Sequence, residues 1–261
     1  MILAGKLKMV SGFLLFTLIA AHSNGSAIRI SNFAFSGNMR DSVKSLFVYF
    51  TVSWDNAWRN DKNYDAAWVF FKLRHQDDSR SHKPVQVKLA GHKMLYNYLN
   101  NVNPDFYVPA HQGGLLIYLS KQYRGNVSWR VKVDFDVSKL TSIDFSNNVV
   151  FGDVFAIEMV QIPGGQFYIG DEDPIKQRKE SSLFDAATKG KFLVNSERSI
   201  SIGDNRGSVN YFNNDLPQFR GDMTGTVPDS FPKGFKQFFV MKYEVKQGEY
   251  TAFLNTLSNQ S

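Results

Sequence analysis

The sequence predicts a mainly β protein of the α+β class, with an antiparallel β-sandwich over residues 28–153 and a second part over 154–261. Three observations support this prediction. Several segments alternate apolar and polar residues with a period of two, as strands with one buried face do. Glycine, asparagine, aspartate and proline separate these segments, as expected of turns. Aromatic residues reach 15%, and they fit a half-buried sheet surface.

The most regular alternation occurs in 45–54 and 129–137. One face of the first segment carries Leu46, Val48, Phe50, Val52 and Trp54. One face of the second carries Trp129, Val131, Val133, Phe135 and Val137. We expect both faces to line a core. The segments 68–73 and 115–119 are apolar throughout, as expected of interior strands, and 28–35 and 85–89 are further strand candidates.

The N-terminus has the three-part pattern of a secretory signal peptide over residues 1–27. Lys6 and Lys8 precede an apolar stretch at 9–21, and small residues follow. The apolar stretch is shorter than the roughly 20 residues that a transmembrane helix needs. We therefore expect an exported protein of the periplasm, cell surface or medium, without a transmembrane anchor after cleavage. The mature chain is expected to begin between Asn24 and Ile28; the alternative for this segment is a buried N-terminal helix.

Composition excludes several classes of site. The chain contains no cysteine, so disulfides, zinc–thiolate sites and thiol nucleophiles are impossible in it. The formal net charge is +6, but lysine and arginine are scattered rather than clustered. Nucleic-acid binding requires a clustered basic surface, so we expect no nucleic-acid partner.

A segment rich in tryptophan, WDNAWR at 54–59 and NYDAAW at 63–68, allows two interpretations. Its aromatic rings could stack on a ligand such as a sugar. The favoured interpretation is structural: a strand end and tight turn, in which Asp and Asn accept backbone hydrogen bonds and tryptophan fills the end of the sandwich. Asp55, Asp61 and Asp65 lack the spacing of a calcium loop.

The four histidines of the first part show no metal-ligand spacing, and we expect them to be solvated loop residues: His75, His82, His92 and His111. No Ser/His/Asp arrangement and no phosphate-binding glycine loop can be argued from the sequence. The sequence therefore predicts no catalytic, no cofactor-binding and no metal-ligating residue in this chain.

The second part opens with a strand, a Pro163-Gly164-Gly165 turn and a second strand, all within 158–170. A polar stretch from 171 to about 232 follows, with strand candidates at 191–194 and 199–202. A further strand is expected at 238–243 and a helix from about Lys246. That helix carries one apolar stripe at i, i+3, i+4 and i+7, formed by Tyr250, Phe253, Leu254 and Leu257. Lysine is a poor N-cap, because it cannot accept a hydrogen bond.

Two stretches of this part, EMVQIPGGQFYIG at 158–170 and the segment 231–257 with its FFVMKYEVKQGEYTAFLNTL core, carry a resemblance to a known family. They resemble the start of the formylglycine-generating-enzyme, or sulfatase-modifying-factor, family, whose domain is a variant of the C-type-lectin-like fold. The WDNAWR and YDAAW segments are similar to an N-terminal module that precedes such domains in exported bacterial proteins of the Bacteroidota.

The resemblance implies that only the first portion of such a domain is present, truncated after its first helix. In the family, the copper-binding cysteine pair, the calcium sites and the iron sites of related enzymes lie beyond that point, so no cofactor is implied for this chain. The first hypothesis for the function is that the chain is an exported, non-catalytic fragment of such a protein. The alternatives are a surface or periplasmic module that recognises a glycan or a protein through its sandwich, and a subunit that completes an oxidase site with another chain.

Overall fold

The computed structural model describes residues 2–5, 28–38, 45–75, 82–99, 101–140, 150–170, 183–210 and 224–257. The chain divides into two compact units. The first unit combines Met1–Gln161 with Val240–Ser261, and the second is Ile162–Phe239. This division differs from the predicted boundary between 153 and 154, because one long strand crosses that boundary inside the first unit. Each unit is described by itself.

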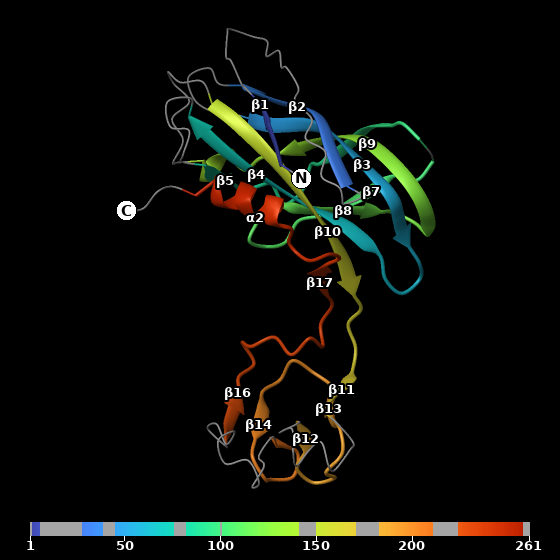
Figure 1. Cartoon of the computed structure of the whole chain (residues 1–261), viewed down its shortest axis with the longest axis vertical. Helices are drawn as coiled ribbons and strands as arrows, with labels where there is room; N and C mark the ends of the chain where they lie inside the picture. The colour runs from blue at the N-terminus through green and yellow to red at the C-terminus, as the bar shows by residue number, and fades with distance from the viewer. Residues whose placement is uncertain are drawn as a thin grey trace. The chain divides into compact units, whose positions relative to one another are not determined.

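The first unit contains two antiparallel sheets (Figure 1). The first sheet has the order β1-β10-β4-β8-β7, with β5 added to β4 and β17 added to β10. Its strands are β1 (Ile2–Gly5), β10 (Val150–Ile162), β4 (Asp65–His75), β8 (Leu115–Leu119), β7 (Pro104–Tyr107), β5 (Lys83–Val85) and β17 (Phe238–Met241). β10 pairs with β4 over eleven residues, from Val150 opposite His75 to Val160 opposite Asp65.

The second sheet has the order β2-β3-β9-β6. Its strands are β2 (Ile28–Asn38), β3 (Ser45–Arg59), β9 (Tyr123–Asp134) and β6 (Lys93–Asn97). A short 3-10 helix, η1 (Val137–Lys139), follows β9. The predicted mainly β fold with antiparallel, sandwich-like sheets is thus confirmed, and most of the expected strands lie within these elements.

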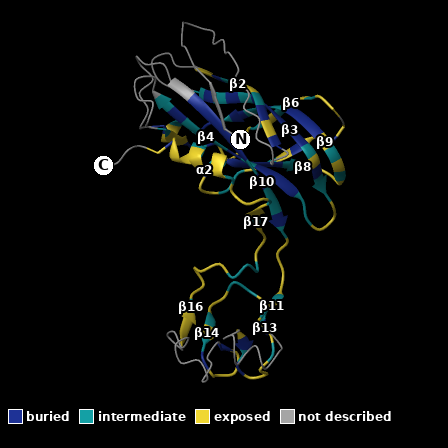
Figure 2. Ribbon diagram, in the orientation of Figure 1, coloured by how far each residue is buried: buried dark blue, intermediate teal, exposed yellow. Residues whose placement is uncertain are grey.

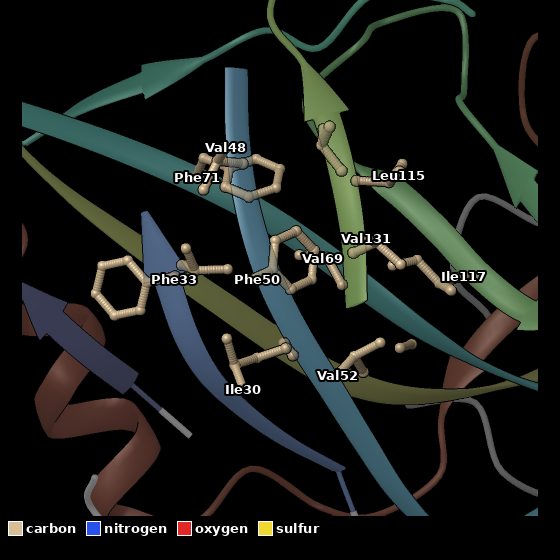
Figure 3. Close-up of a cluster of buried hydrophobic side chains, with 14 of the residues drawn as sticks. Ile30, Phe33, Val48, Phe50, Val52, Val69, Phe71, Leu115, Ile117 and Val131 are labelled. Carbon is tan, nitrogen blue, oxygen red and sulfur yellow. The ribbon is translucent and has the colours of Figure 1, made fainter. Parts of the chain in front are cut away.

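The inner faces of the two sheets form one apolar core, shown in Figure 3 with side chains from β2, β3, β4, β8 and β9. The predicted face of β3 is buried: Leu46 is 3% exposed, and the other four members are fully covered. On β9, the predicted face is also buried up to Phe135. Val137 lies beyond the strand, in η1, and is only partly buried. Period-two alternation therefore identified the core-facing residues wherever the strand itself was regular.

A β-bulge interrupts the pairing of β3 with β9 between Trp54 and Ala57. Asn56 lies in the bulge with a φ of 56°, the left-handed region that asparagine tolerates better than most residues. Its backbone N–H donates to Asn126 Oδ1 at 3.1 Å. The bulge lets β3 continue to Arg59, five residues beyond the predicted strand end.

The second unit consists of short strands. β11 (Phe167–Ile169) pairs with β13 (Phe192–Val194), and a separate sheet has the order β12-β15-β14-β16. The strands of that sheet are β12 (Phe184–Asp185), β15 (Val209–Asn210), β14 (Ile200–Ile202) and β16 (Gly225–Val227). The second unit has a small core formed by Phe192 and Val194 of β13 and Val209 of β15. The strands expected at 191–194 and 199–202 are thereby confirmed, while the C-type-lectin-like character of this part stays a prediction.

The Pro163-Gly164-Gly165 turn of the second unit depends on close backbone approach. The N–H of Gly165 donates to the carbonyl of Phe235 at 2.8 Å. A Cβ on Gly164 would lie 2.9 Å from the backbone nitrogen of Gln237, closer than side-chain carbons normally come. Glycine at 164 is thus required by packing against the segment that leads into β17.

The helix α2 (Gln247–Leu254) returns to the first unit and begins one residue after Lys246, close to the expected start. The Lys246 side chain makes no capping bond. The Lys246 N–H donates to the Glu249 carboxylate at 3.2 Å, the reciprocal bond of a capping box, and this acidic residue in the first turn also suits the helix dipole. Among the described residues, no helix has the length and apolar character needed to cross a membrane.

Of the predicted signal peptide at 1–27, the structure describes only residues 2–5. They form β1, which pairs antiparallel with β10 from Ile2 opposite Phe155 to Gly5 opposite Gly152. The apolar stretch at 9–21 and the expected cleavage positions lie outside the described residues, so the signal peptide stays a prediction.

Candidate binding face

The outer face of the first sheet, opposite the core, carries aromatic and charged side chains. Strand alternation places Phe70 and Lys72 of β4 there, beside Phe155 and Ile157 of β10. Phe70 and Phe155 are directly opposed in the register, and their rings stack with centroids 4.9 Å apart and planes 9° apart. This stacked ring pair lies on the outer face of the first sheet.

The helix α2 lies against this outer face, beside β4 in Figure 1. Lys72 Nζ donates to Thr256 Oγ1 at 2.6 Å, and Thr256 Oγ1 in turn donates to the carbonyl of Phe253. The Lys72 ammonium also lies 5.5 Å from the centre of the Phe253 ring, within cation–π range. Thr256 is buried, so one polar residue past the helix end fixes α2 to the sheet.

A pocket of about 270 Å³ lies between the sheet and the helix; we call it the α2 groove. Most of its lining is apolar, and the polar exceptions are Lys72, Glu249 and Thr256. The apolar lining consists of Phe70, Phe155, Ala156, Ile157, Met241, Val245, Tyr250 and Phe253. Such a space accommodates apolar side chains and offers few hydrogen-bonding groups to a polar ligand.

Three of the four residues of the predicted apolar stripe lie on α2, while Leu257 lies beyond the end of the helix. The four stripe residues, Tyr250, Phe253, Leu254 and Leu257, are between 44% and 56% exposed. Figure 2 shows α2 as an exposed element on a largely buried sheet. The segment before the helix adds further exposed apolar side chains at Val240, Met241, Tyr243 and Val245. These side chains lie in one stretch of the sequence, interrupted by charged residues, and they expose apolar surface at and beside the α2 groove.

A buried ionic cluster holds this segment on the sandwich; we call it the Lys242 cluster. Lys242 Nζ lies 3.0 Å from Asp65 Oδ2 and 2.5 Å from Glu158 Oε1. The two carboxylates are almost fully buried, and Trp54 Nε1 donates to Glu158 Oε1 at 3.2 Å. The Lys242 N–H also donates to the carbonyl of Glu158 at 2.9 Å. The Lys242 cluster therefore joins strands β3, β4 and β10 to the segment after β17.

Burial and charge compete within the Lys242 cluster. Burial raises the pKa of Asp65 to about 6, although the Trp58 N–H, 2.8 Å from Asp65 Oδ1, and Lys242 both favour the ionised carboxylate. Burial lowers the pKa of Lys242, but hydrogen bonds to Glu158 and Asp65 outweigh it, and the pKa lies above its ordinary value. The single Lys242 ammonium thus contacts two buried carboxylates at once.

The tryptophan-rich segment behaves as the structural interpretation expects. Trp54 is fully buried in the core, and Asp65 accepts a backbone hydrogen bond from Trp58. Asn60 Oδ1 accepts the N–H groups of Lys62 and Asn63 in the turn. The three aspartates do not converge: Asp55 pairs with Arg29 at 2.6 Å, Asp65 belongs to the Lys242 cluster, and Asp61 lies exposed in the turn.

One histidine differs from the expected solvated state. His82 Nε2 lies 3.0 Å from Asp153 Oδ2, with the two side chains 10% and 4% exposed, so His82 is a paired, nearly buried residue. Burial raises the pKa of Asp153 to about 6, against the effect of Arg74 and Lys72. His92 is half-buried between Lys88 and Asp134, and burial lowers its pKa. The expectation of solvation is therefore wrong for His82; the His75 side chain lies outside the described residues.

No metal centre can be built from these groups. Over the described part of the chain, no three or more acidic or histidine side chains come together in a way that could hold a metal ion. The copper, calcium and iron of the family that the sequence resembles therefore find no fitting donor set there, and we derive no chemistry through them.

Sequence reasoning missed the two features that define this face. Lys242 stands in the strand candidate FFVMKY, and a lysine between apolar residues was the available signal for a buried cation. The contact of α2 with β4 depends on Lys72 and Thr256, which are 184 positions apart. Comparison of the chain with protein-family models, with curated proteins and with solved structures gives no match in any of the three.

Proposed function

We propose that this chain is an exported, non-catalytic binding protein whose outer face recognises an apolar segment of another polypeptide. The observation that carries this proposal is the exposed apolar surface of residues 240–257 beside the α2 groove. Soluble proteins rarely leave a continuous apolar surface open unless a partner covers it. The Lys242 cluster and the Lys72–Thr256 bond hold this surface in a defined position, as a binding site requires.

The chemistry of the groove favours a polypeptide over a glycan. A sugar presents hydroxyl groups, each of which needs a hydrogen-bonding partner when it is buried. The groove offers Lys72, Glu249 and Thr256 as its polar side chains, and Lys72 is already bonded to Thr256. An apolar peptide side chain needs no such partner and gains about 1.5–3 kcal/mol by full burial.

Export and the absence of catalysis rest on the sequence. The pattern at 1–27 supports an exported chain, and the resemblance of 158–170 and 231–257 supports a relation to the formylglycine-generating-enzyme family. Because the chain has no cysteine, it cannot supply the copper-binding pair that the resemblance implies for the active enzymes. We therefore assign it a binding role, and its fold alone does not select a function.

The binding role is tested with the chain 28–261 on two libraries, one of apolar peptides and one of glycans. We expect binding to peptides, lost in the double variant Tyr250→Lys/Phe253→Lys, which places two charges on the exposed stripe. The matched control is Tyr96→Lys/Tyr98→Lys, which changes two aromatic residues, one in β6 of the second sheet and one just after it, 59% and 52% exposed. Binding to glycans alone, unaffected by the α2 variant, would refute the proposal and favour the sugar-binding alternative.

The non-catalytic assignment has its own test. Purified chain supplied with copper or iron and a thiol-containing peptide is expected to consume no oxygen above the buffer rate and to retain no metal after desalting. Tightly held copper or iron together with oxygen consumption would overturn this assignment, whatever the peptide library shows.

A further inference from the structure

One edge of β10 pairs with β4, and the opposite edge carries β1 and β17. β4 pairs with β10 over positions 150–160, so it occupies one edge of β10 for nearly the whole strand. β1 and β17 also pair with β10, and they must therefore use the opposite edge. β1 takes positions 152–155, and the bond between Lys242 and Glu158 shows where the β17 segment meets β10. β1 thus occupies four residues of this edge, 152–155, and the segment after β17 bounds them on the C-terminal side at Glu158.

The strand on this stretch belongs to the segment that signal cleavage would remove. Cleavage between Asn24 and Ile28 takes away Ile2–Gly5 together with the rest of 1–27. The described side chains of the main core run from Ile28 onward, and the chain 28–261 keeps all of them. Removal of β1 leaves backbone N–H and C=O groups of 152–155 without strand partners, and such an edge accepts another strand.

We infer that in the mature protein positions 152–155 of β10 form a strand-addition site, which binds an uncharged, extended segment of a partner polypeptide antiparallel to β10. The inference rests on the proposed export and identifies how the binding face engages its ligand. In the structure β1 occupies this site from within the chain. Main-chain hydrogen bonds supply affinity in this binding mode, and side-chain positions supply specificity.

The groove next to the edge determines the preferred side chains of the ligand. Directly opposed residues of an antiparallel pair share a face, so the ligand residue opposite Phe155 lies on the face of the α2 groove, which Phe155 lines. An apolar residue is favoured at that position. The residue opposite Asp153 lies on the same face, beside the nearly buried His82–Asp153 pair, and a small uncharged residue is favoured there. In β1, these positions are Ile2 and Ala4.

The test compares amide hydrogen exchange in 28–261 and in the full chain 1–261. We expect the amides that β1 protects within 152–155 to exchange about tenfold faster or more in 28–261, since unpaired edge amides open easily. The probe is the capped peptide MILAGKLK, the sequence of residues 1–8. At saturation it restores protection to 28–261, whereas the same peptide with Leu3→Pro, or with Ile2→Lys opposite Phe155, does not.

The outcomes separate this inference from the proposals on which it rests. If mass spectrometry shows that the exported chain retains residues 1–5, then both export processing and the free edge are refuted. If the chain begins between 24 and 28 but 152–155 stay protected without the probe, or the probe restores nothing, then the strand-addition site alone is wrong. Probe binding by 28–261 that leaves exchange at 152–155 unchanged would place the ligand elsewhere and refute the site as well.

Discussion

At the scale of single residues, Lys242 is the group on which the binding face depends most. Its ammonium contacts both Asp65 and Glu158, two carboxylates that are almost fully buried. Removing one partner of a buried ionic cluster leaves uncompensated charge, which costs far more than the cluster contributes when it is complete. Mutation at this position therefore tests whether the segment 240–257 is held by charge.

We expect Lys242→Met to lower the free energy of unfolding of the first unit by about 3–5 kcal/mol. The matched control, Lys242→Arg, retains the charge and is expected to cost less. The measurement is urea unfolding followed by tryptophan fluorescence. All four tryptophans, Trp54, Trp58, Trp68 and Trp129, lie in the first unit, so the signal reports that unit alone. Equal losses in both variants would mean that packing, rather than charge, holds this position.

The raised pKa of Asp65 predicts how the free energy of unfolding depends on pH. Its pKa is about 6 in the folded chain against an ordinary value of 3.8, so the folded state binds more protons between these values. Its contribution to stability is fully present below about pH 4 and is lost as the pH rises through 6, by about 2–3 kcal/mol in total. Asp65→Asn removes this loss. The difference in unfolding free energy between the two proteins, measured from pH 4 to 7, isolates Asp65; a difference independent of pH would contradict the prediction.

Residue-level features were the least accessible to sequence reasoning. The pairing of His82 with Asp153 joins positions 71 residues apart, and Lys242 is 177 positions from Asp65. A sequence displays neighbours along the chain, whereas charge compensation depends on neighbours in space. The turn residues were an exception: Asn60 accepts hydrogen bonds from positions two and three residues later, a local pattern that composition does indicate.

At the scale of elements, burial divides the apolar faces into two kinds. Phe50 of β3 is fully buried in the core, while Phe253 of α2 is 47% exposed. We predict that Phe50→Ala lowers the unfolding free energy by about 3–5 kcal/mol because it leaves a cavity. Phe253→Ala is expected to cost less than about 1 kcal/mol, since much of the ring already contacts water. Urea titration of both variants decides, and similar losses would show that α2 is part of the core.

Alternation predicted elements well where one face is wet and the other is buried. On β3 and β9, every second residue points to the core, and the apolar pattern shows it directly. β10 was harder, because VFGDVFAIEMVQI mixes apolar residues on both faces, and its outer face is covered in part by the aromatic pair Phe70–Phe155 and by α2. The sequence therefore did not reveal that β10 continues across the boundary expected between 153 and 154. The helix start was predictable, but the partner of its apolar stripe was not.

At the scale of the whole molecule, the two units have separate cores. The main core draws on residues from Ile28 to Ala156, and the small core of the second unit draws on Phe192, Val194 and Val209. The sequence predicts that the first part ends at 153 and the second begins at 154. β10 modifies that expectation, because Val154 and Ala156 belong to the main core and Glu158 to the Lys242 cluster. A fragment that ends at 153 lacks all three.

This arrangement predicts the effect of deleting the second unit. Replacing 162–239 by a flexible glycine–serine linker leaves every described member of the main core and the Lys242 cluster in place. We expect this protein to unfold in one transition, with a free energy within about 1 kcal/mol of the first unit in the chain 28–261. The fragment 28–153, which loses β10, is expected to show no cooperative tryptophan transition. The opposite result, a stable 28–153 and an unfolded deletion protein, would mean that the second unit supports the sandwich and that the boundary at 153 is the correct one.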